Sequence, residues 1–314
     1  MVKQAAGAER PGDGDGDSQR PGRRGVVRYL QDEAAPSAPR MLLGNALRHR
    51  RDAIPLTQEE VARQLGCSPS KVSRRESGHH HLKERDLPQL FAVYRIEDPE
   101  DQRVLHGLVE VANQATWWQP WATVAQQYLQ AVVSFEDMAQ RIRSYDCHYL
   151  HGLLQTPAYA RALIERGRGS RDTHDALVEL RKERQARFTA AADKLLICVV
   201  HEGALRNPVG SKEIMYEQLD HLIELSRDRR HQIRMAEWGR FDMPVELGTT
   251  TIFDFEGLAP KIAYAEAIDG GLIVQDEDLV DRREKAFDAL RVRSLAPDAT
   301  RHRLQHLLSS KIYG

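Results

Sequence analysis

The segment from Thr57 to Ser77 constrains the fold of this 314-residue chain more than any other part of its sequence. Thr57-Gln58-Glu59-Glu60 has the form of a capping box. In such a box the Thr57 hydroxyl accepts a hydrogen bond from the Glu60 amide, and the Glu60 side chain reaches back to the Thr57 amide. The pattern predicts a short helix from Gln58 to Leu65. Its apolar face is formed by Val61, Ala62 and Leu65.

A turn and a second short helix follow directly. Gly66 suits the left-handed position after the first helix, where a side chain would be strained. Ser68 can cap a second helix, and Pro69 occupies its first turn, where no amide hydrogen bond is lost. Val72 fills the interface, and the small side chain of Ala62 lets the two helices approach. Two short helices joined by a Gly-containing turn are the helix-turn-helix geometry.

The second helix, residues 68–77, is expected to enter the major groove of double-stranded DNA with its N-terminus first. Arg and Lys can address guanine there, and Ser suits several base edges. The residues expected to contact DNA are Gln58, Ser68, Ser70, Lys71, Ser73, Arg74 and Arg75. Among these, Gln58 is placed for a phosphate contact, and Arg75 either takes a phosphate or pairs locally.

A second set of residues is expected to build the motif rather than to read DNA. Its members are Thr57, Glu60, Ala62, Gly66, Val72 and Glu76. We expect Glu76 to brace the helix against a basic residue of the preceding helix, such as Arg48 or Arg51, because a carboxylate facing DNA would be repelled.

Charge is distributed unevenly along the chain. The whole sequence has 45 Lys+Arg and 46 Asp+Glu, a net charge of -1 that by itself would disfavour nucleic acid as a partner. Residues 40–95, however, contain eleven basic and six acidic residues, whereas residues 96–314 carry a net charge of −6. A local basic patch of this kind is what nucleic-acid binding requires.

The residues of this region disfavour two other interpretations, an ordinary helical hairpin and a metal site. An ordinary αα-hairpin with a solvated surface would not combine the capping box, the Gly turn, the Ser-Pro start and the local basic charge. The histidines at 79–81 and the alternating Asp13, Asp15 and Asp17 are metal-ligating residue types. Adjacent imidazoles rarely converge on one ion without further ligands, and no bidentate Glu follows the aspartates. We therefore expect no metal and no cofactor.

The rest of the chain divides by composition and periodicity. Residues 1–39 are rich in Gly and Pro and are expected to be a disordered tail. Residues 40–97, with amphipathic helices over Met41–Arg51 and Leu87–Tyr94, are expected to form a mainly α domain of about five helices. Residues 98–125 are expected to be a linker or hinge, in which Trp117, Trp118 and Trp121 form either an interface or ordinary core.

Residues 126–314 are expected to form a larger α+β domain with a small mixed sheet. Helices are predicted over Val124–Asp146, Asp172–Ala191, Ser211–Ser226, Asp278–Ser294 and Asp298–Ser309. Strands are predicted over Lys194–His201, His231–Trp238, Thr249–Phe255, Lys261–Ala267 and Leu272–Val274.

Little in this larger domain indicates catalysis. His201-Glu202 could act as an acid and base, but no nucleophile, Gly-rich phosphate loop or metal-spaced set accompanies the pair. Cys198 lies in an apolar run, which favours core packing over nucleophilic chemistry. We therefore expect a protein that is not an enzyme. Three widely spaced cysteines, no apolar N-terminal segment and no spanning apolar run favour a cytoplasmic protein without a membrane partner.

Two parts of the sequence resemble known families. Leu47-Arg48, Leu56 to Ala62 and Ser68 to Gly78 resemble the Cro/C1-type (XRE family) helix-turn-helix domain. Further along, the order of five motifs resembles the antitoxin-like domain that follows such modules in actinobacterial regulators similar to WhiJ. These motifs are Trp117-Trp118, Gly152 to Thr156, Arg181 to Gln185, Glu202 to Arg206 and Pro208-Val209-Gly210. His151, where that family usually has Pro, and Asn207 depart from the pattern.

The resemblance implies a transcription factor that works with a small partner protein encoded nearby. Together with the residues, it predicts a sequence-specific regulator that binds paired half-sites as a homodimer, because one short recognition helix reads too few base pairs alone. The larger domain would supply dimerisation and the sensing of a partner or signal. Three alternatives stay open: an antitoxin-like protein that chiefly neutralises a small partner, a small-molecule-responsive regulator, and an enzyme with a DNA-binding tether.

Overall fold

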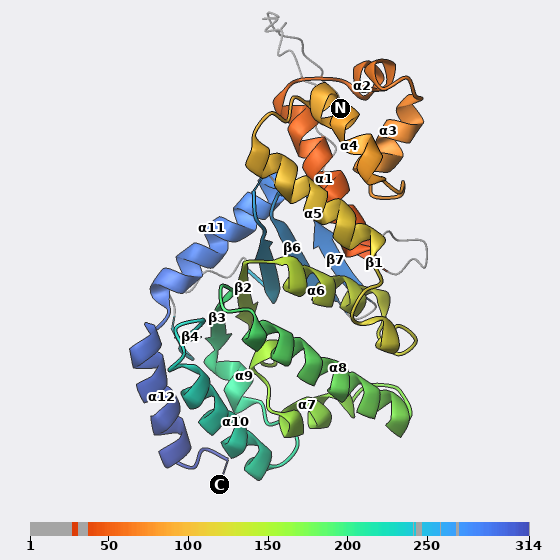
Figure 1. Ribbon diagram of the computed structural model, residues 1–314. Helices are drawn as coiled ribbons and strands as arrows, with labels where there is room; N and C mark the ends of the chain where they lie inside the picture. The colour runs from red at the N-terminus through yellow and green to blue at the C-terminus, as the bar shows by residue number, and fades with distance from the viewer. Residues whose placement is uncertain are drawn as a thin grey trace, which may run out of the picture.

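The computed structural model describes residues 27–30, 37–240, 242, 247–257, 259–267 and 270–313. A helical N-terminal domain forms one end of the molecule, and a larger α+β domain forms the rest (Figure 1). The predicted fold class is therefore confirmed. No helix in the described residues is both long and apolar enough to cross a membrane.

The N-terminal domain consists of five α-helices. These are α1 (Ala38–Ala53), α2 (Gln58–Gln64), α3 (Pro69–Glu76), α4 (Leu87–Tyr94) and α5 (Pro99–Asn113), with a 3-10 turn at Glu84–Asp86 before α4. Leu47 of α1, Val61 of α2 and Val72 of α3 are fully buried, as their spacing along each helix requires. The helix-turn-helix pair thus rests on a shared apolar core with α1.

Helix α5 corrects the expectation of a linker over residues 98–125. Asp98 caps its N-terminus by accepting from the Glu100 amide (2.7 Å), and Pro99 stands in the first turn. The helix buries Leu105 and Val109 and packs along α1. An Asp-Pro start followed by an amphipathic period was present in the sequence, so the segment is a structural part of the domain.

Strand β1 (Val27–Leu30) corrects the expectation that all of residues 1–39 form a disordered tail. It pairs antiparallel with β7 (Gly270–Val274), with Val27 opposite Val274 and Leu30 opposite Gly271. Its partner lies more than 200 residues away, so no local pattern could reveal the pairing. Residues 1–26, including Asp13, Asp15 and Asp17, lie outside the described residues.

The larger domain contains most of one mixed sheet. The remaining strands are β2 (Arg141–Asp146), β3 (Leu195–His201), β4 (His231–Ala236), β5 (Thr250–Asp254) and β6 (Ile262–Ala267). Within the described residues the order is β1-β7-β6-β5-β2-β3-β4, with β2, β3 and β4 parallel and the other pairings antiparallel. Helices make the parallel crossovers, as parallel strands require: α7 (Pro157–Ile164) and α8 (Arg171–Ala190), then α9 (Glu202–Arg206) and α10 (Lys212–Leu225).

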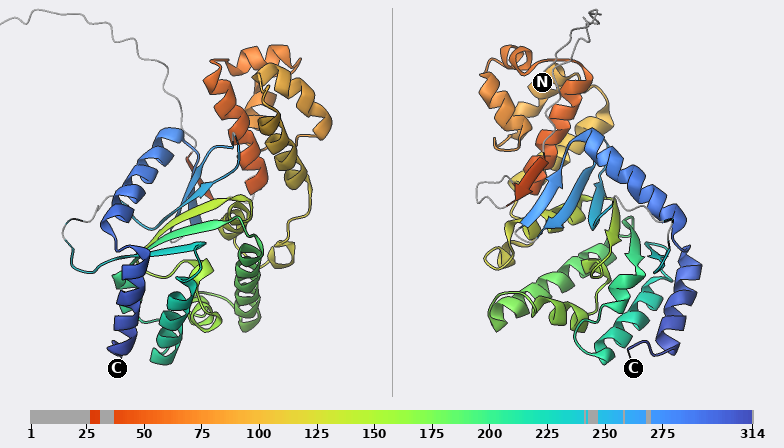
Figure 2. Two further views of the ribbon diagram at one scale, coloured as in Figure 1. Left: turned by 60° about the vertical axis from the view of Figure 1, so that its left-hand side comes forward. Right: turned by 180° about the vertical axis from the view of Figure 1, so that it is seen from behind.

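Helices cover both faces of this sheet (Figure 2). α11 (Glu277–Arg293) packs Phe287 and Leu290 against one face, where Val199 of β3 points. Cys198 and Val200 point to the opposite face, in the core that also contains residues of α6 (Gln127–Met138), α8, α10 and α12 (Pro297–Ser309). Cys198 is 0% exposed and belongs to the core, as its apolar neighbours indicate.

The predicted long helix over Val124–Asp146 is wrong in its second half. α6 ends at Met138, and Arg141–Asp146 forms the central strand β2. Arg143 lies buried in this strand and donates to Asp254 Oδ1 (2.6 Å) and Glu284 Oε1 (2.7 Å). A buried, paired arginine in mid-strand hides the apolar alternation by which a strand is recognised.

The three tryptophans belong to the core between α6 and α8. Trp118 is 9% exposed and donates from Nε1 to Ser134 Oγ (2.7 Å). The Trp117 ring lies under Arg187 of α8, with 4.9 Å between the guanidinium carbon and the ring centroid, and Trp121 packs against Trp117. Of the two interpretations left open by the sequence, ordinary core therefore fits these contacts.

Candidate nucleic-acid interface

The capping box at the start of α2 has the expected geometry. The Glu60 amide donates to Thr57 Oγ1 (3.2 Å), and the Thr57 amide donates to Glu60 Oε2 (2.7 Å). The backbone hydrogen bond from Thr57 is the main reason that the pKa of Glu60 lies below its ordinary value. The start of α2 is thus fixed by its own residues.

The turn between α2 and α3 closes in the way that Gly66 predicts. Gly66 has a φ of 60°, in the left-handed region. The Cys67 amide donates to the Ala62 carbonyl (2.9 Å) and the Gly66 amide to the Arg63 carbonyl (3.3 Å). This pair of hydrogen bonds is a Schellman motif, which ends α2 and sets the direction in which α3 departs.

Helix α3 presents a polar face to solvent. Ser68 caps the helix by accepting from the Lys71 amide (3.3 Å), and Pro69 occupies the first turn. Ser68, Ser70, Ser73 and Arg74 are exposed, and Lys71 is partly exposed. The pKa of His80 lies below its ordinary value. The main cause is burial, followed by the positive charges of Arg75, Lys71 and Arg74. Three basic side chains, Lys71, Arg74 and Arg75, thus lie near His80 at the end of α3.

A buried carboxylate joins four helices behind this face. Glu76 of α3 accepts from Arg51 Nε of α1 at Oε1 (2.7 Å) and from Arg51 Nη2 at Oε2 (3.1 Å). Gln58 Nε2 of α2 donates to Oε2 (2.9 Å), and the Tyr94 hydroxyl of α4 donates to Oε1 (3.1 Å). Burial, followed by the charge of Glu76, raises the pKa of Tyr94, so its hydroxyl remains a donor. We call these four residues the Glu76 network.

The Glu76 network shows which arginine pairs with Glu76 and where the Gln58 side chain points. The partner of Glu76 is Arg51, one of the two arginines expected. The other, Arg48, has its Nε 3.8 Å from Asp52 Oδ2. Gln58 directs its amide nitrogen inward, so a phosphate contact from this side chain stays a prediction. Within the described residues, Glu76 holds α3 from behind and leaves its serine-rich face outward.

Arg75, for which the sequence left open either a phosphate contact or a local pair, lies on the inward side of α3. It is 8% exposed, and its Nε has no hydrogen-bond partner among the described residues. The reason is helical spacing: Arg75 and Glu76 follow Val72 by three and four positions, so all three share the inward face of α3. The predicted reading face is therefore reduced to Ser70, Lys71, Ser73 and Arg74, with Ser68 at its start.

Sequence reasoning missed a close contact at Gly44 of α1. A Cβ atom at Gly44 would lie 2.7 Å from the carbonyl oxygens of Arg75 and Glu76 and 2.8 Å from the Gly78 nitrogen. The backbone of α1 thus touches the end of α3 directly. The only available signal was a glycine in the middle of an otherwise regular amphipathic helix.

Replacing Gly44 with alanine should therefore loosen the placement of α3. We expect Gly44→Ala to cost about 1–3 kcal/mol, because the added Cβ would lie 2.7 Å from the carbonyl oxygens of Arg75 and Glu76 and would push α3 away from α1. Gly107→Ala in α5 is the matched control, since nothing lies within 4 Å of its Cβ position and the change should be neutral or stabilising. Urea unfolding of both variants checks this, and equal stability of the two would contradict the close contact.

Comparison with known families identifies both parts of the chain. A model described as a helix-turn-helix domain matches residues 42–105 and supports a DNA-binding regulator. A model described as a domain of unknown function, DUF5753, matches residues 129–306, more than half of the chain. The chain belongs to the DUF5753 family. No curated protein and no solved structure matches it.

The DUF5753 match begins in α6 and ends in α12, so it covers β2 to β7 and both helical layers. Strand β1 lies outside both matched ranges although it extends the same sheet. The helix-turn-helix match ends inside α5, which packs along α1. Strand β1, which precedes α1 in the chain, thus belongs to the sheet of the DUF5753 range through its pairing with β7.

Both members of the candidate acid–base pair in the DUF5753 domain, His201 and Glu202, make hydrogen bonds that stabilise the fold. His201 Nδ1 accepts from the Gly203 amide (3.0 Å) at the start of α9. Glu202 is 1% exposed and accepts from Arg206, Arg303 and the Trp238 amide. Both side chains thus fix the connection between β3 and α9. Within the described residues, no cluster of three His, Cys, Asp or Glu side chains could hold a metal ion.

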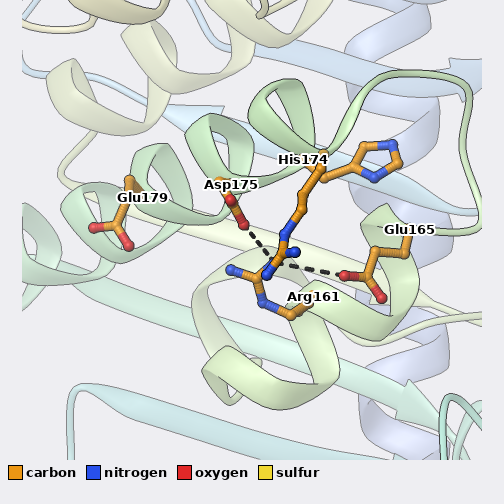
Figure 3. A pocket seen from close by; sticks show the side chains of 6 residues that line it. Arg161, Glu165, His174, Asp175 and Glu179 are labelled. Atoms are coloured by element: carbon orange, nitrogen blue, oxygen red, sulfur yellow. Dashed lines mark hydrogen bonds and ion pairs between the residues drawn. The ribbon is translucent and has the colours of Figure 1, made fainter.

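A hollow in the DUF5753 domain lies between α7 and α8 (Figure 3). Arg161 stands in its middle, with Nη1 2.6 Å from Asp175 Oδ1 and 3.5 Å from Glu165 Oε1. Glu179 lines the same surface. These exposed charges pair mainly with one another, and surface pairs of this kind contribute little to stability.

Proposed function

We propose that this chain is a sequence-specific transcriptional regulator that reads the major groove of double-stranded DNA with α3. The observation that carries the proposal is the outward face of α3, where Ser70, Ser73 and Arg74 are exposed and Lys71 is partly exposed. Phosphate contacts position such a helix, and side chains that reach base edges give it specificity. The helix-turn-helix match and the net basic charge of residues 40–95 support the same conclusion.

The proposal includes a homodimer. A helix of eight residues reaches only a few base pairs, so specificity requires two copies on paired half-sites about one helical turn apart. The DUF5753 domain would supply dimerisation or respond to a partner or signal. We propose no catalytic role for it, because His201 and Glu202 are engaged in holding the β3–α9 connection.

Substitutions on α3 test the proposal. We expect Lys71→Ala and Arg74→Ala each to weaken binding to a DNA site selected by the intact chain from a random-sequence pool. The loss should be about 1–3 kcal/mol for a side chain that reads a base. The matched control is Arg63→Ala, which removes an exposed arginine from α2. Fluorescence anisotropy with the intact chain measures the affinities at fixed salt. If both α3 variants bind as Arg63→Ala does, α3 is not the reading helix.

A further inference from the structure

A pocket of about 220 Å³ lies where the helix-turn-helix domain meets the DUF5753 domain. Asn45, Arg48, His49 and Asp52 of α1 line one side, and residues 275–278 at the start of α11 line the other. Both domains contribute to the walls, so neither contains the pocket alone. We call it the junction pocket.

Negative charge predominates in the junction pocket. Its lining includes four carboxylates, Asp52, Asp276, Glu277 and Asp278, against the cation of Arg48 and the imidazole of His49. His49 Nδ1 lies 3.5 Å from Glu277 Oε2. No arrangement suited to a metal ion occurs in the described part of the chain. An organic cation, which needs no fixed coordination geometry, therefore suits this charge better than a metal ion does.

Asn45 gives an independent indication of a polar ligand. It lines the pocket, is 6% exposed, and its Nδ2 has no hydrogen-bond partner among the described residues. Buried amide groups are nearly always paired, so this exception requires a reason. The terminal torsion of asparagine is broad and soft, and rotation about it would bring the amide to an acceptor held in the pocket.

One wall of the junction pocket is connected to the recognition helix. Asp52 Oδ1 accepts from Arg51 Nη1 (2.7 Å), and the same Arg51 donates to Glu76 of α3. A ligand that draws Asp52 toward itself would change the position of Arg51 and therefore the hydrogen bonds that Arg51 donates to Glu76. Two ion pairs, Asp52–Arg51 and Arg51–Glu76, therefore connect the pocket to the inward side of α3.

We propose that the junction pocket binds a small molecule that carries an ammonium group and a hydrogen-bond acceptor, an amino acid or an amino alcohol, and that its occupancy changes the affinity for DNA. The volume lies below the range of about 300–1,000 Å³ that drug-sized ligands occupy, which limits the ligand to a small one. The ammonium group meets the carboxylates, and the acceptor meets Asn45. The regulatory half of this proposal rests on the proposed function, whereas the binding half does not.

Thermal unfolding of the intact chain tests the binding half. The probes are the standard amino acids, ethanolamine and serinol, each at millimolar concentration and constant ionic strength. Comparing the amino acids with the two amino alcohols distinguishes a carboxylate acceptor from a hydroxyl acceptor. We expect at least one probe to raise the Tm saturably. Asn45→Leu, which keeps the branching of the side chain but removes its polar atoms, and Asp278→Asn should each abolish the shift. Glu179→Gln, in the separate α7–α8 hollow, should leave it unchanged (Figure 3).

Two results would overturn the binding half: no probe shifts the Tm, as expected of a pocket filled by water only, or the shift survives both pocket variants. DNA binding tests the regulatory half. A bound probe should change the Kd for the selected DNA site at least fivefold. Binding without such a change would refute regulation through this pocket. Failure of the intact chain to bind any DNA would refute the proposed function instead and leave the thermal result standing.

Discussion

Replacing Glu76 with alanine should destabilise the helix-turn-helix domain by about 3–5 kcal/mol. The Glu76 side chain is 2% exposed, and its carboxylate receives two hydrogen bonds from Arg51 of α1 and one each from Gln58 of α2 and Tyr94 of α4. Its loss leaves the buried Arg51 guanidinium without its main counter-charge, although Asp52 still lies 2.7 Å from Arg51 Nη1. Breaking one partner out of a buried pair is costly because the other charge remains desolvated.

Urea unfolding and hydrogen exchange of the intact chain measure this effect. Exchange should accelerate most at the amides of α2 and α3, because Glu76 joins these helices to α1 and α4. Glu59→Ala removes an exposed carboxylate from the same domain and should cost far less. If Glu76→Ala proves as stable as Glu59→Ala, the Glu76 network does not hold the motif together.

A second large effect is expected in the DUF5753 domain. Arg184 of α8 and Glu136 of α6 form a bidentate pair, with Nε 2.9 Å from Oε2 and Nη2 2.7 Å from Oε1. Both side chains are almost completely buried, at 6% and 5% exposure. Arg184→Ala should therefore cost about 3–5 kcal/mol, since it leaves the Glu136 carboxylate buried without its bidentate partner, although His151 lies 3.7 Å away and the charge of Arg181 also acts on it.

Arg187→Ala is the matched control on the same helix. Arg187 also makes a bidentate pair with an acid of α6, Asp137, but its side chain is 39% exposed. This variant should lose at most about 1 kcal/mol. Equal losses from Arg184→Ala and Arg187→Ala would show that burial does not set the strength of these pairs.

The effect of Arg184→Ala should also depend on pH. Burial would raise the pKa of Glu136, but the charge and hydrogen bonds of Arg184, together with the charges of His151 and Arg181, hold the pKa below its ordinary value. A depressed pKa stabilises the folded chain above the ordinary carboxyl range, and that stability is lost as the pH falls. In the variant Glu136 can be buried as a neutral acid, so the deficit relative to the unsubstituted chain should shrink toward acid pH.

Much of the helix-turn-helix was predictable because its determinants are local. The Thr57–Glu60 capping box, the left-handed Gly66 and the Ser68-Pro69 start each act within a few residues of the chain. The burial of Arg75 was predictable in principle, since it follows Val72 by three positions, but the basic side chain was read as a DNA contact. The contact between Gly44 and the end of α3 joins two helices and could not be seen from either alone.

The larger domain was predictable in its elements more than in its topology. The predicted strands from β3 to β7 and the helices α8, α10, α11 and α12 agree with the structure to within a few residues at their ends. β2 was missed because Arg143 is buried in ion pairs, and β1 because its only partner is the distant β7. Both errors come from interactions between residues far apart in sequence.

Two sources of control over DNA binding are proposed for this chain. A small partner protein encoded nearby stays a prediction of the family resemblance. The junction pocket offers a second source of control, and it requires both domains to be present. A binding assay on residues 96–314 alone would therefore remove one of its walls, and the intact chain is the proper material for any ligand search.

Selection of DNA from a random-sequence pool by the intact chain tests the central claim most directly. The account predicts enrichment of two related half-sites about one helical turn apart, with the enriched bases changing when Lys71 and Arg74 are both replaced by alanine. Enrichment of no sequence, or of the same sequence by the double variant as by the unsubstituted chain, would contradict a regulator that reads DNA through α3.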